Sequence, residues 1–154
     1  MRRFTLVGYG AIGRSLHQRL QGHARIALVN GLEYMDFAIR RRRGYVEALD
    51  ARGLTPDPAL MSSDEMSEVA GFRAAERMLR LADPPTAFLA ASMISGMDIR
   101  RAVESAGLVL GRDVSLILFD DDLSYMKNGE EEPIFTAMRS SVREAGRLVA
   151  ELLL

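Results

Sequence analysis

The sequence Val114-Ser-Leu-Ile-Leu-Phe119 runs directly into three aspartates, Asp120-Asp121-Asp122. Six uncharged and mostly large apolar residues are typical of a strand that is buried on both faces, as the strands of parallel sheets are. In open α/β sheets, ligands bind just outside the carboxyl ends of the strands. The sequence therefore predicts a core strand that carries carboxylates to the edge of the sheet where ligands bind.

Strand-like and helix-like segments alternate on both sides of this stretch. Short apolar runs predict strands, and apolar residues three or four positions apart predict helices. The predicted strands are 4–7, 25–29, 60–61, 86–91, 114–119 and 133–139, and the predicted helices are 12–20, 37–52, 67–81, 98–105 and 142–152. This alternation predicts one α/β domain over residues 1–154, with a three-layer, doubly wound, mostly parallel sheet and helices on both faces.

The composition excludes several classes of site. The chain has 154 residues, a formal net charge of −1, no cysteine and two histidines. The charge gives no long-range attraction to nucleic acid or to anionic membranes. Without cysteine the chain can form no disulfide and no thiolate site. Two histidines do not make a histidine-rich metal site. We therefore expect no metal and no cofactor. No apolar run is long enough to span a bilayer, and we expect a cytoplasmic location.

A glycine motif near the start of the chain suggests an alternative function. Gly8-Tyr-Gly10-Ala-Ile-Gly13 follows a predicted strand and precedes a predicted helix, and Glu33 lies 20 residues beyond Gly13. A NAD(P)-binding, Rossmann-type oxidoreductase uses such a turn to hold a pyrophosphate and such an acid to bind the ribose. However, the second predicted strand stops at the turn dipeptide Asn30-Gly31, before Glu33, and no clear proton donor follows. The other interpretation is a glycine-rich connection without a cofactor.

Four blocks of sequence from Gly22 onward carry a family resemblance. They are Gly22-His-Ala-Arg-Ile-Ala-Leu-Val-Asn-Gly31, Phe37-Ala-Ile-Arg-Arg-Arg-Arg-Gly-Tyr-Val-Glu-Ala-Leu49, Pro84-Pro-Thr-Ala-Phe-Leu-Ala-Ala91 and Ala106-Gly-Leu-Val-Leu-Gly-Arg-Asp-Val-Ser-Leu-Ile-Leu-Phe-Asp-Asp121. In this order and spacing they resemble the effector-binding domain of LacI/GalR-type transcriptional regulators. The resemblance implies the C-terminal subdomain of a periplasmic-binding-protein-like fold, with an irregular return segment, residues 123–140, that contacts an N-terminal subdomain in the full regulator.

The resemblance also implies a function. We expect the effector-sensing part of a DNA-binding regulator, not an enzyme, with a sugar or related metabolite as the effector. A homodimer is expected, and DNA would be bound only through a helix-turn-helix that this sequence does not contain. No membrane contact is expected.

Arg41 and Asp120 are the first two candidate ligand-binding residues. The resemblance assigns the ligand role to Arg41 among the four consecutive arginines 40–43, and a guanidinium at a strand end can bind hydroxyls or a carboxylate in a fork. The alternative for Arg41 is one more solvated charge in a basic run. Asp120 ends the core strand, where a carboxylate accepts hydrogen bonds from hydroxyls; the alternative is a local cap. Asp120 and Asp121 together do not predict acid–base catalysis, because no nucleophile or metal-ligand set accompanies them.

Ser92 and Met66 complete the predicted site. The family usually carries Asn-Asp where this chain has Ser92-Met93. Ser92 therefore takes the position of an amide that normally binds the effector, and a carboxylate is lost beside it. Met66 aligns with an apolar residue that packs on ligands. These changes point to a less polar or differently substituted ligand than the usual sugars.

Overall fold

One parallel sheet organises the part of the chain that the computed structural model describes, which is residues 25–120, 128–129, 132–139 and 141–153. Its strand order is β2-β1-β3-β4-β5, and every neighbouring pair is parallel. The strands are β1 (Ile26–Asn30), β2 (Met61–Ser63), β3 (Ala87–Ala90), β4 (Ser115–Asp120) and β5 (Thr136–Arg139). The α/β class with a parallel sheet is therefore confirmed, while the segments predicted at 4–7 and 12–20 lie outside the described residues.

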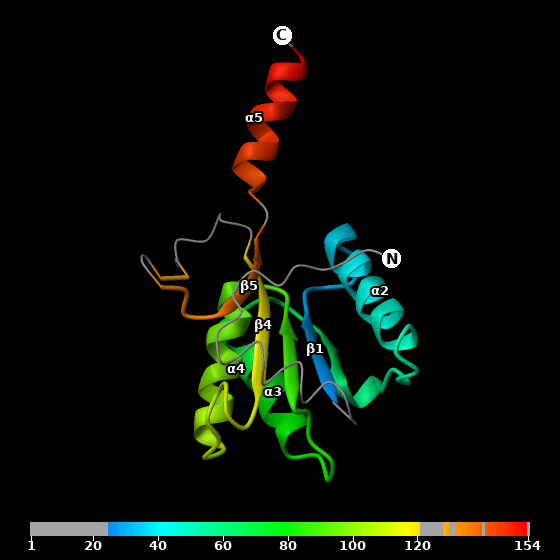
Figure 1. Ribbon diagram of the computed structural model, residues 1–154, viewed down its shortest axis with the longest axis vertical. Helices are drawn as coiled ribbons and strands as arrows, with labels where there is room; N and C mark the ends of the chain where they lie inside the picture. Colours follow the sequence, from blue (N-terminus) through cyan, green and yellow to red (C-terminus); the bar gives the residue numbers. More distant parts are fainter. Residues whose placement is uncertain (1–24, 121–127, 130–131, 140, 154) are drawn as a thin grey trace.

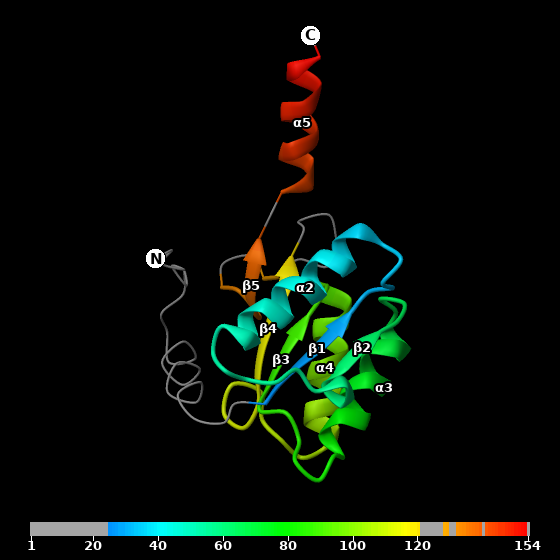
Figure 2. The ribbon, with the colours of Figure 1, turned by 90° about the vertical axis from the view of Figure 1, so that its right-hand side faces the viewer.

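Helices cover both faces of this sheet, and the last helix extends away from it (Figures 1 and 2). They are α2 (Asp36–Asp50), α3 (Glu68–Leu79), α4 (Met93–Ser105) and α5 (Val142–Leu152), with one 3-10 turn, η1 (Pro58–Leu60). The chain passes from β1 to β2 in one direction and from β2 through β3 to β4 in the other. Right-handed crossovers therefore place α2 on one face and both α3 and α4 on the opposite face.

The start of α4 differs from the prediction. The helix begins at Met93, five residues before the predicted start at Asp98, because Ser92 is its N-cap and accepts a hydrogen bond from the Ser95 backbone N–H at 3.1 Å. Such a cap satisfies a backbone donor that the first helical turn leaves unpaired. The prediction missed this start because Ser92 was interpreted as a ligand-binding residue, and the apolar residues Met93 and Ile94 after it gave no sign of a new helix.

The two faces of the sheet are covered unequally. Alternate strand residues point to opposite faces. Val29, Phe88 and Leu118 are buried among the residues of α3 and α4, whereas Leu28 packs with Tyr45 on the α2 side. The first cluster contains 16 buried apolar residues and the second contains three, so within the described ranges the α2 face lacks much of its cover.

An acidic side chain is buried where α3 meets α4. Asp98 is 1% exposed, and a Cβ added to Gly71 on the facing helix would lie 2.9 Å from its Oδ2. Its Oδ1 lies 3.5 Å from the Arg101 guanidinium, and its Oδ2 has no hydrogen-bond partner among the described residues. Burial raises the pKa of Asp98 from 3.8 to about 6; Arg101 lowers it and Glu68 raises it further. Gly71 therefore provides the space that this carboxyl occupies.

The last helix, α5, extends away from the sheet (Figure 1). The predicted helix at 142–152 is confirmed, but none of its described residues is buried. Leu148 and Val149 are about half exposed and Leu152 is 86% exposed. In the described chain, α5 thus presents an apolar stripe that covers nothing. No helix among the described residues is both long enough and apolar enough to cross a membrane.

Candidate functional site

The carboxyl ends of the strands bring the candidate residues to one edge of the sheet. All five strands are parallel, so Asn30, Ala90, Asp120 and Arg139, which end β1, β3, β4 and β5, share this edge. Ligands of open α/β sheets bind at such an edge. The strand-end site defined here comprises this edge and the side chains of α2 and α4 that reach it.

Arg41 reaches the strand-end site from the second turn of α2. Its guanidinium carbon lies 4.0 Å from the ring centroid of Phe119 and 4.7 Å from that of Phe37. Its Nη1 donates a hydrogen bond of 2.8 Å to the carbonyl oxygen of Ala91, just past β3. Cation–π contact and this hydrogen bond hold the plane of the guanidinium in place above the ends of β3 and β4.

The other three arginines of the run make surface ion pairs. Arg40 pairs with Asp36 and Arg43 with Glu47, each at 2.7 Å and one helical turn apart. Arg42 pairs with Glu33. The four arginines are therefore not equivalent, because Arg41 alone of them turns toward the strand ends. The pairing also places Glu33, the acid of the dinucleotide alternative, in the loop before α2 and past the end of β1.

Asp120 is the last residue of β4 and is 6% exposed. Its Oδ2 lies 3.4 Å from Nε of Arg139, the residue beside it in the register of β4 and β5. An ion pair between neighbouring strand ends compensates part of the cost of burying the carboxylate. Sequence reasoning did not identify Arg139, although its position as the last residue of the next predicted strand is a signal for it.

Ser92 lies where β3 passes into α4, next to the carbonyl that binds Arg41. Its hydroxyl accepts from the Ser95 N–H and lies 3.1 Å from the Ser95 hydroxyl. Met93, which replaces the family's carboxylate, is 3% exposed and belongs to the apolar core. The structure therefore gives Ser92 a capping role and places Met93 away from the strand-end site.

Met66 lies in the loop between β2 and α3. A Cβ added to Gly31 would lie 3.5 Å from the Met66 sulfur and 3.1 Å from a ring carbon of Phe37. Met66 and Phe37 therefore both border Gly31, and Phe37 also contacts Arg41. Asn30, the last residue of β1, is 3% exposed. Its Nδ2 donates to the Ala38 carbonyl, and its Oδ1 has no hydrogen-bond partner in the described part of the chain. Sequence reasoning used Asn30 only as a turn signal.

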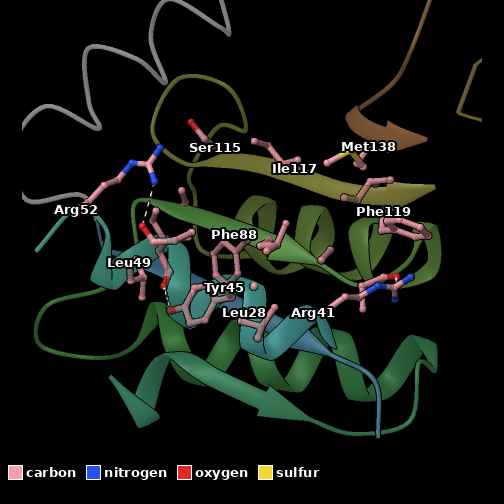
Figure 3. Close-up of a pocket in the computed structure, with 18 residues that line it drawn as sticks. Leu28, Arg41, Tyr45, Leu49, Arg52, Phe88, Ser115, Ile117, Phe119 and Met138 are labelled. Carbon is pink, nitrogen blue, oxygen red and sulfur yellow. Dashed lines mark hydrogen bonds between the residues drawn. The ribbon is translucent and has the colours of Figure 1, made fainter. Parts of the chain in front are cut away.

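A separate groove of about 400 Å³ lies between α2 and the sheet (Figure 3). Arg41, Phe119 and Met138 stand at one of its ends and Arg52 at the other. Its lining is mostly apolar: Ser115 and Tyr45 are polar exceptions, and the Tyr45 hydroxyl already donates to the Ile26 carbonyl. The groove therefore offers few of the hydrogen-bonding groups that a polar ligand needs. In the described residues there is no group of three or more His, Asp or Glu side chains that could hold a metal ion.

The family model for the periplasmic binding protein-like domain matches residues 16–154. The HTH-type transcriptional regulator AglR of Rhizobium meliloti is 43% identical over 133 residues, which cover 86% of this chain and 37% of that protein. A LacI-family regulatory protein from Chloroflexus aggregans has a similar structure, with a TM-score of 0.78 and 27% identity over 94% of this chain and 51% of the other.

The structure described as a transcriptional regulator CelR–cellobiose complex is also similar, with a TM-score of 0.75 and 30% identity over 93% of this chain and 44% of that one. The chain therefore spans about half or less of the length of these relatives. The comparisons give no support to the dinucleotide alternative. Because the family model covers most of the sequence and the relatives are regulators with the same parallel sheet, this chain belongs to the periplasmic binding protein-like domains of LacI-type transcriptional regulators.

Proposed function

We propose that the chain senses a small polyhydroxylated effector as the C-terminal half of the effector-binding domain of a LacI-type regulator. The observation that carries the proposal is Arg41, fixed on Phe119 at the edge where Asp120 ends β4. A guanidinium of fixed orientation donates paired hydrogen bonds, and a carboxylate accepts them. Together they suit the adjacent hydroxyls of a sugar or related metabolite, and the cellobiose named for the CelR complex supports this ligand class.

This proposal gives a different ligand contact to each of the other predicted residues, Asp120, Ser92 and Met66. Asp120 accepts hydroxyl hydrogen bonds, and Met66 packs an apolar edge of the ligand beside Phe37. Ser92 contributes less than an asparagine would, because its hydroxyl also caps α4. With Met93 in the core, the site offers fewer polar groups than Asn-Asp would, which favours a less polar or differently substituted ligand.

The other side of the cleft belongs to an N-terminal subdomain in this proposal. The relatives are about twice as long as the matched region or longer. In this proposal, residues 123–140 include the connection toward that subdomain, although residues 136–139 pair with β4 as strand β5. The exposed apolar stripe of α5 supports a protein surface beyond it. An effector held between the two subdomains changes their relative orientation if it binds one orientation more tightly. A homodimer then transmits the change to helix-turn-helix segments on DNA; the chain performs no catalysis and needs no cofactor.

Titration with saccharides tests the proposal. Cellobiose and glucose are added to the isotope-labelled chain while backbone amide NMR shifts are followed. We expect saturable shifts concentrated at residues 30–41, 91–92 and 119–120, with weak affinity because one half of a cleft supplies half of the contacts. Shifts confined to other regions, or equal for every small polyol, would show that the effector does not bind at the strand-end site.

A further inference from the structure

An exposed tyrosine stands on the loop that follows β1, at the same edge of the sheet as the strand-end site. The loop joins Asn30, the last residue of β1, to Asp36, the first residue of α2 (Figure 1). Tyr34, in this loop, is 77% exposed. The proposed function gives it no contact. A large ring that is left in water at a ligand-binding edge is a surface on which a ligand can pack.

The loop that carries Tyr34 is tied to its surroundings on two sides. The hydroxyl of Ser63, the last residue of β2, donates to the Gly31 carbonyl and accepts from the Glu33 backbone N–H, each at 3.1 Å. The Glu33 carboxylate pairs with Arg42 of α2. Because the backbone beside Tyr34 is already fixed, less conformational freedom is lost when its ring contacts a ligand.

A small apolar floor lies at the base of this loop. A Cβ added to Gly31 would lie 3.1 Å from a ring carbon of Phe37 and 3.5 Å from the Met66 sulfur, so the absence of a side chain at Gly31 lets both pack against the end of β1. Phe37 and Met66 are each partly exposed. Phe37 also contacts the Arg41 guanidinium, 4.7 Å from its ring centroid. The apolar floor therefore continues directly into the polar part of the strand-end site.

We propose that Tyr34 and this floor bind the second ring of a disaccharide or larger glycoside, whose first ring lies beside Arg41 and Asp120. This inference rests on the proposed function and adds the size of the ligand to it. β3 alone lies between β1 and β4, and neighbouring strands are about 4.8 Å apart, so the ends of β1 and β4 lie about 10 Å apart. One pyranose ring is shorter than this distance, whereas two linked rings span it.

The chemistry of the two parts of the site suits two sugar rings. A pyranose carries hydroxyl groups around its rim and C–H groups on its faces. The rim hydroxyls of the first ring match the guanidinium of Arg41 and the carboxylate of Asp120. A face of the second ring can stack on the Tyr34 ring, and the phenolic hydroxyl can exchange a hydrogen bond with a sugar hydroxyl.

Titration of the chain with glucose, cellobiose and maltose tests this inference, with backbone amide NMR shifts as the readout. The three sugars differ in the number of rings and in linkage. We expect the wild-type chain to bind the better disaccharide at least about fivefold more tightly than glucose, because one stacked ring adds a contact of this size. Tyr34→Ala should abolish this difference by weakening only the disaccharide, and Tyr34→Phe should keep most of it because the ring remains.

Ile39→Ala is the matched control for the loss of an exposed apolar side chain. Ile39 is 50% exposed on α2, and residues two positions apart on a helix, such as Ile39 and Arg41, do not face each other. We expect this variant to bind all three sugars like the wild type.

The outcomes separate this inference from the proposed function. Equal affinity for glucose and both disaccharides, or a disaccharide advantage that persists in Tyr34→Ala, would overturn the inference and leave the proposed function intact. Weaker glucose binding in Tyr34→Ala, or an equal loss of disaccharide affinity in Ile39→Ala, would overturn it as well. If no sugar shifts the amides of residues 91–92 and 119–120, the proposed function fails and this inference fails with it.

Discussion

Arg41 differs from its three neighbours in its surroundings, and that difference can be measured. Arg41→Ala removes the guanidinium from Phe119 and from the Ala91 carbonyl. Loss of a charge-assisted hydrogen bond costs roughly 1.5–3 kcal/mol, so we expect about tenfold or greater loss of saccharide affinity. The measurement is calorimetry of the complete regulator.

Arg42→Ala is the matched control for this prediction. Arg42 makes a surface pair with Glu33, and exposed ion pairs contribute little to stability. We expect wild-type affinity and a nearly unchanged melting temperature. Equal losses for Arg41→Ala and Arg42→Ala would contradict the assignment of Arg41 to the site.

Asp98 predicts an unusual dependence of stability on pH. Its pKa rises from 3.8 in the unfolded chain to about 6 in the fold, mainly through burial. Between these two values the folded state binds more protons than the unfolded state, so the free energy of unfolding falls as pH rises from about 4 to about 6. Above about pH 6 the fold carries the full destabilisation from burying the charged Asp98 carboxylate, and below about pH 4 this destabilisation is absent.

Asp98→Asn should therefore stabilise the protein at pH 7, by up to about 3 kcal/mol if the whole pKa shift is relieved. The gain should disappear at pH 4, where the wild-type carboxyl is protonated in both states. Urea unfolding of both proteins at pH 4, 5, 6 and 7 checks this. A gain that is the same at every pH would mean that the amide improves packing and that the charge of Asp98 is unimportant.

The residues of the site divide into those that sequence can identify and those that it cannot. Asp120 could be placed at a strand end because the apolar run of β4 stops there, whereas Arg41 is selected among the four arginines by the family resemblance. The Phe119 and Phe37 rings around Arg41 could not be predicted, since their contact depends on how α2 crosses β4. The Oδ1 of Asn30, which has no hydrogen-bond partner among the described residues, also escapes prediction, because a turn dipeptide does not indicate the burial of its side chain.

At the scale of elements, the change in melting temperature caused by Gly44→Leu shows whether the surface of α2 around Gly44 is open to water or covered. If this surface is open to water, Gly44→Leu adds a better helix former and raises the melting temperature. If another segment lies against it, the larger side chain prevents close approach and lowers the melting temperature by several degrees. We expect the decrease, measured by circular dichroism, because parallel sheets are normally covered on both faces.

Arg43→Leu provides the control for the Gly44 substitution. Its side chain is 80% exposed and points to solvent on the same helix. We expect a change of no more than about 0.5 kcal/mol in the free energy of unfolding. A similar decrease in both variants would mean that added apolar surface, and not the groove, destabilises α2.

Sequence patterns identified every described strand and α-helix, with errors at the ends, but not the 3-10 helix η1. The parallel direction of the strands could be predicted from their alternation with helices, because a crossover connection between two parallel strands usually contains a helix. The predicted strand at 60–61 is displaced to Met61–Ser63, since η1 occupies Pro58–Leu60. Of the segment predicted at 133–139, the second half pairs with β4 as strand β5. Periodicity marks such elements but does not define the first or last hydrogen bond.

The whole molecule is expected to self-associate. The apolar stripe of α5, with Val142, Leu148, Val149 and Leu152 at least 47% exposed, has no partner in the described chain, and surfaces of this kind usually mark interfaces. Multi-angle light scattering should show dimers or larger species at high protein concentration. Leu148→Lys combined with Leu152→Lys should shift the population toward monomer.

The matched control for self-association keeps the stripe and changes the opposite face of α5. Arg147 forms ion pairs with Glu144 and Glu151 on that face. Arg147→Gln should leave the molar mass distribution unchanged. A monodisperse wild-type monomer at high concentration would show that α5 does not drive association.

The short link between β5 and α5 has a mechanical consequence. Two residues separate Arg139 from Val142, so the helix is coupled to the strand almost directly. Among the described strands β5 lies at the edge of the sheet and pairs with β4, and its last residue meets Asp120 in an ion pair. A protein that displaces α5 would act first on Arg139 and its contact with Asp120, because Arg139 is the strand residue nearest the link. The position of the Asp120 carboxylate, at the end of β4, would thus respond to whatever α5 binds before the central strands move.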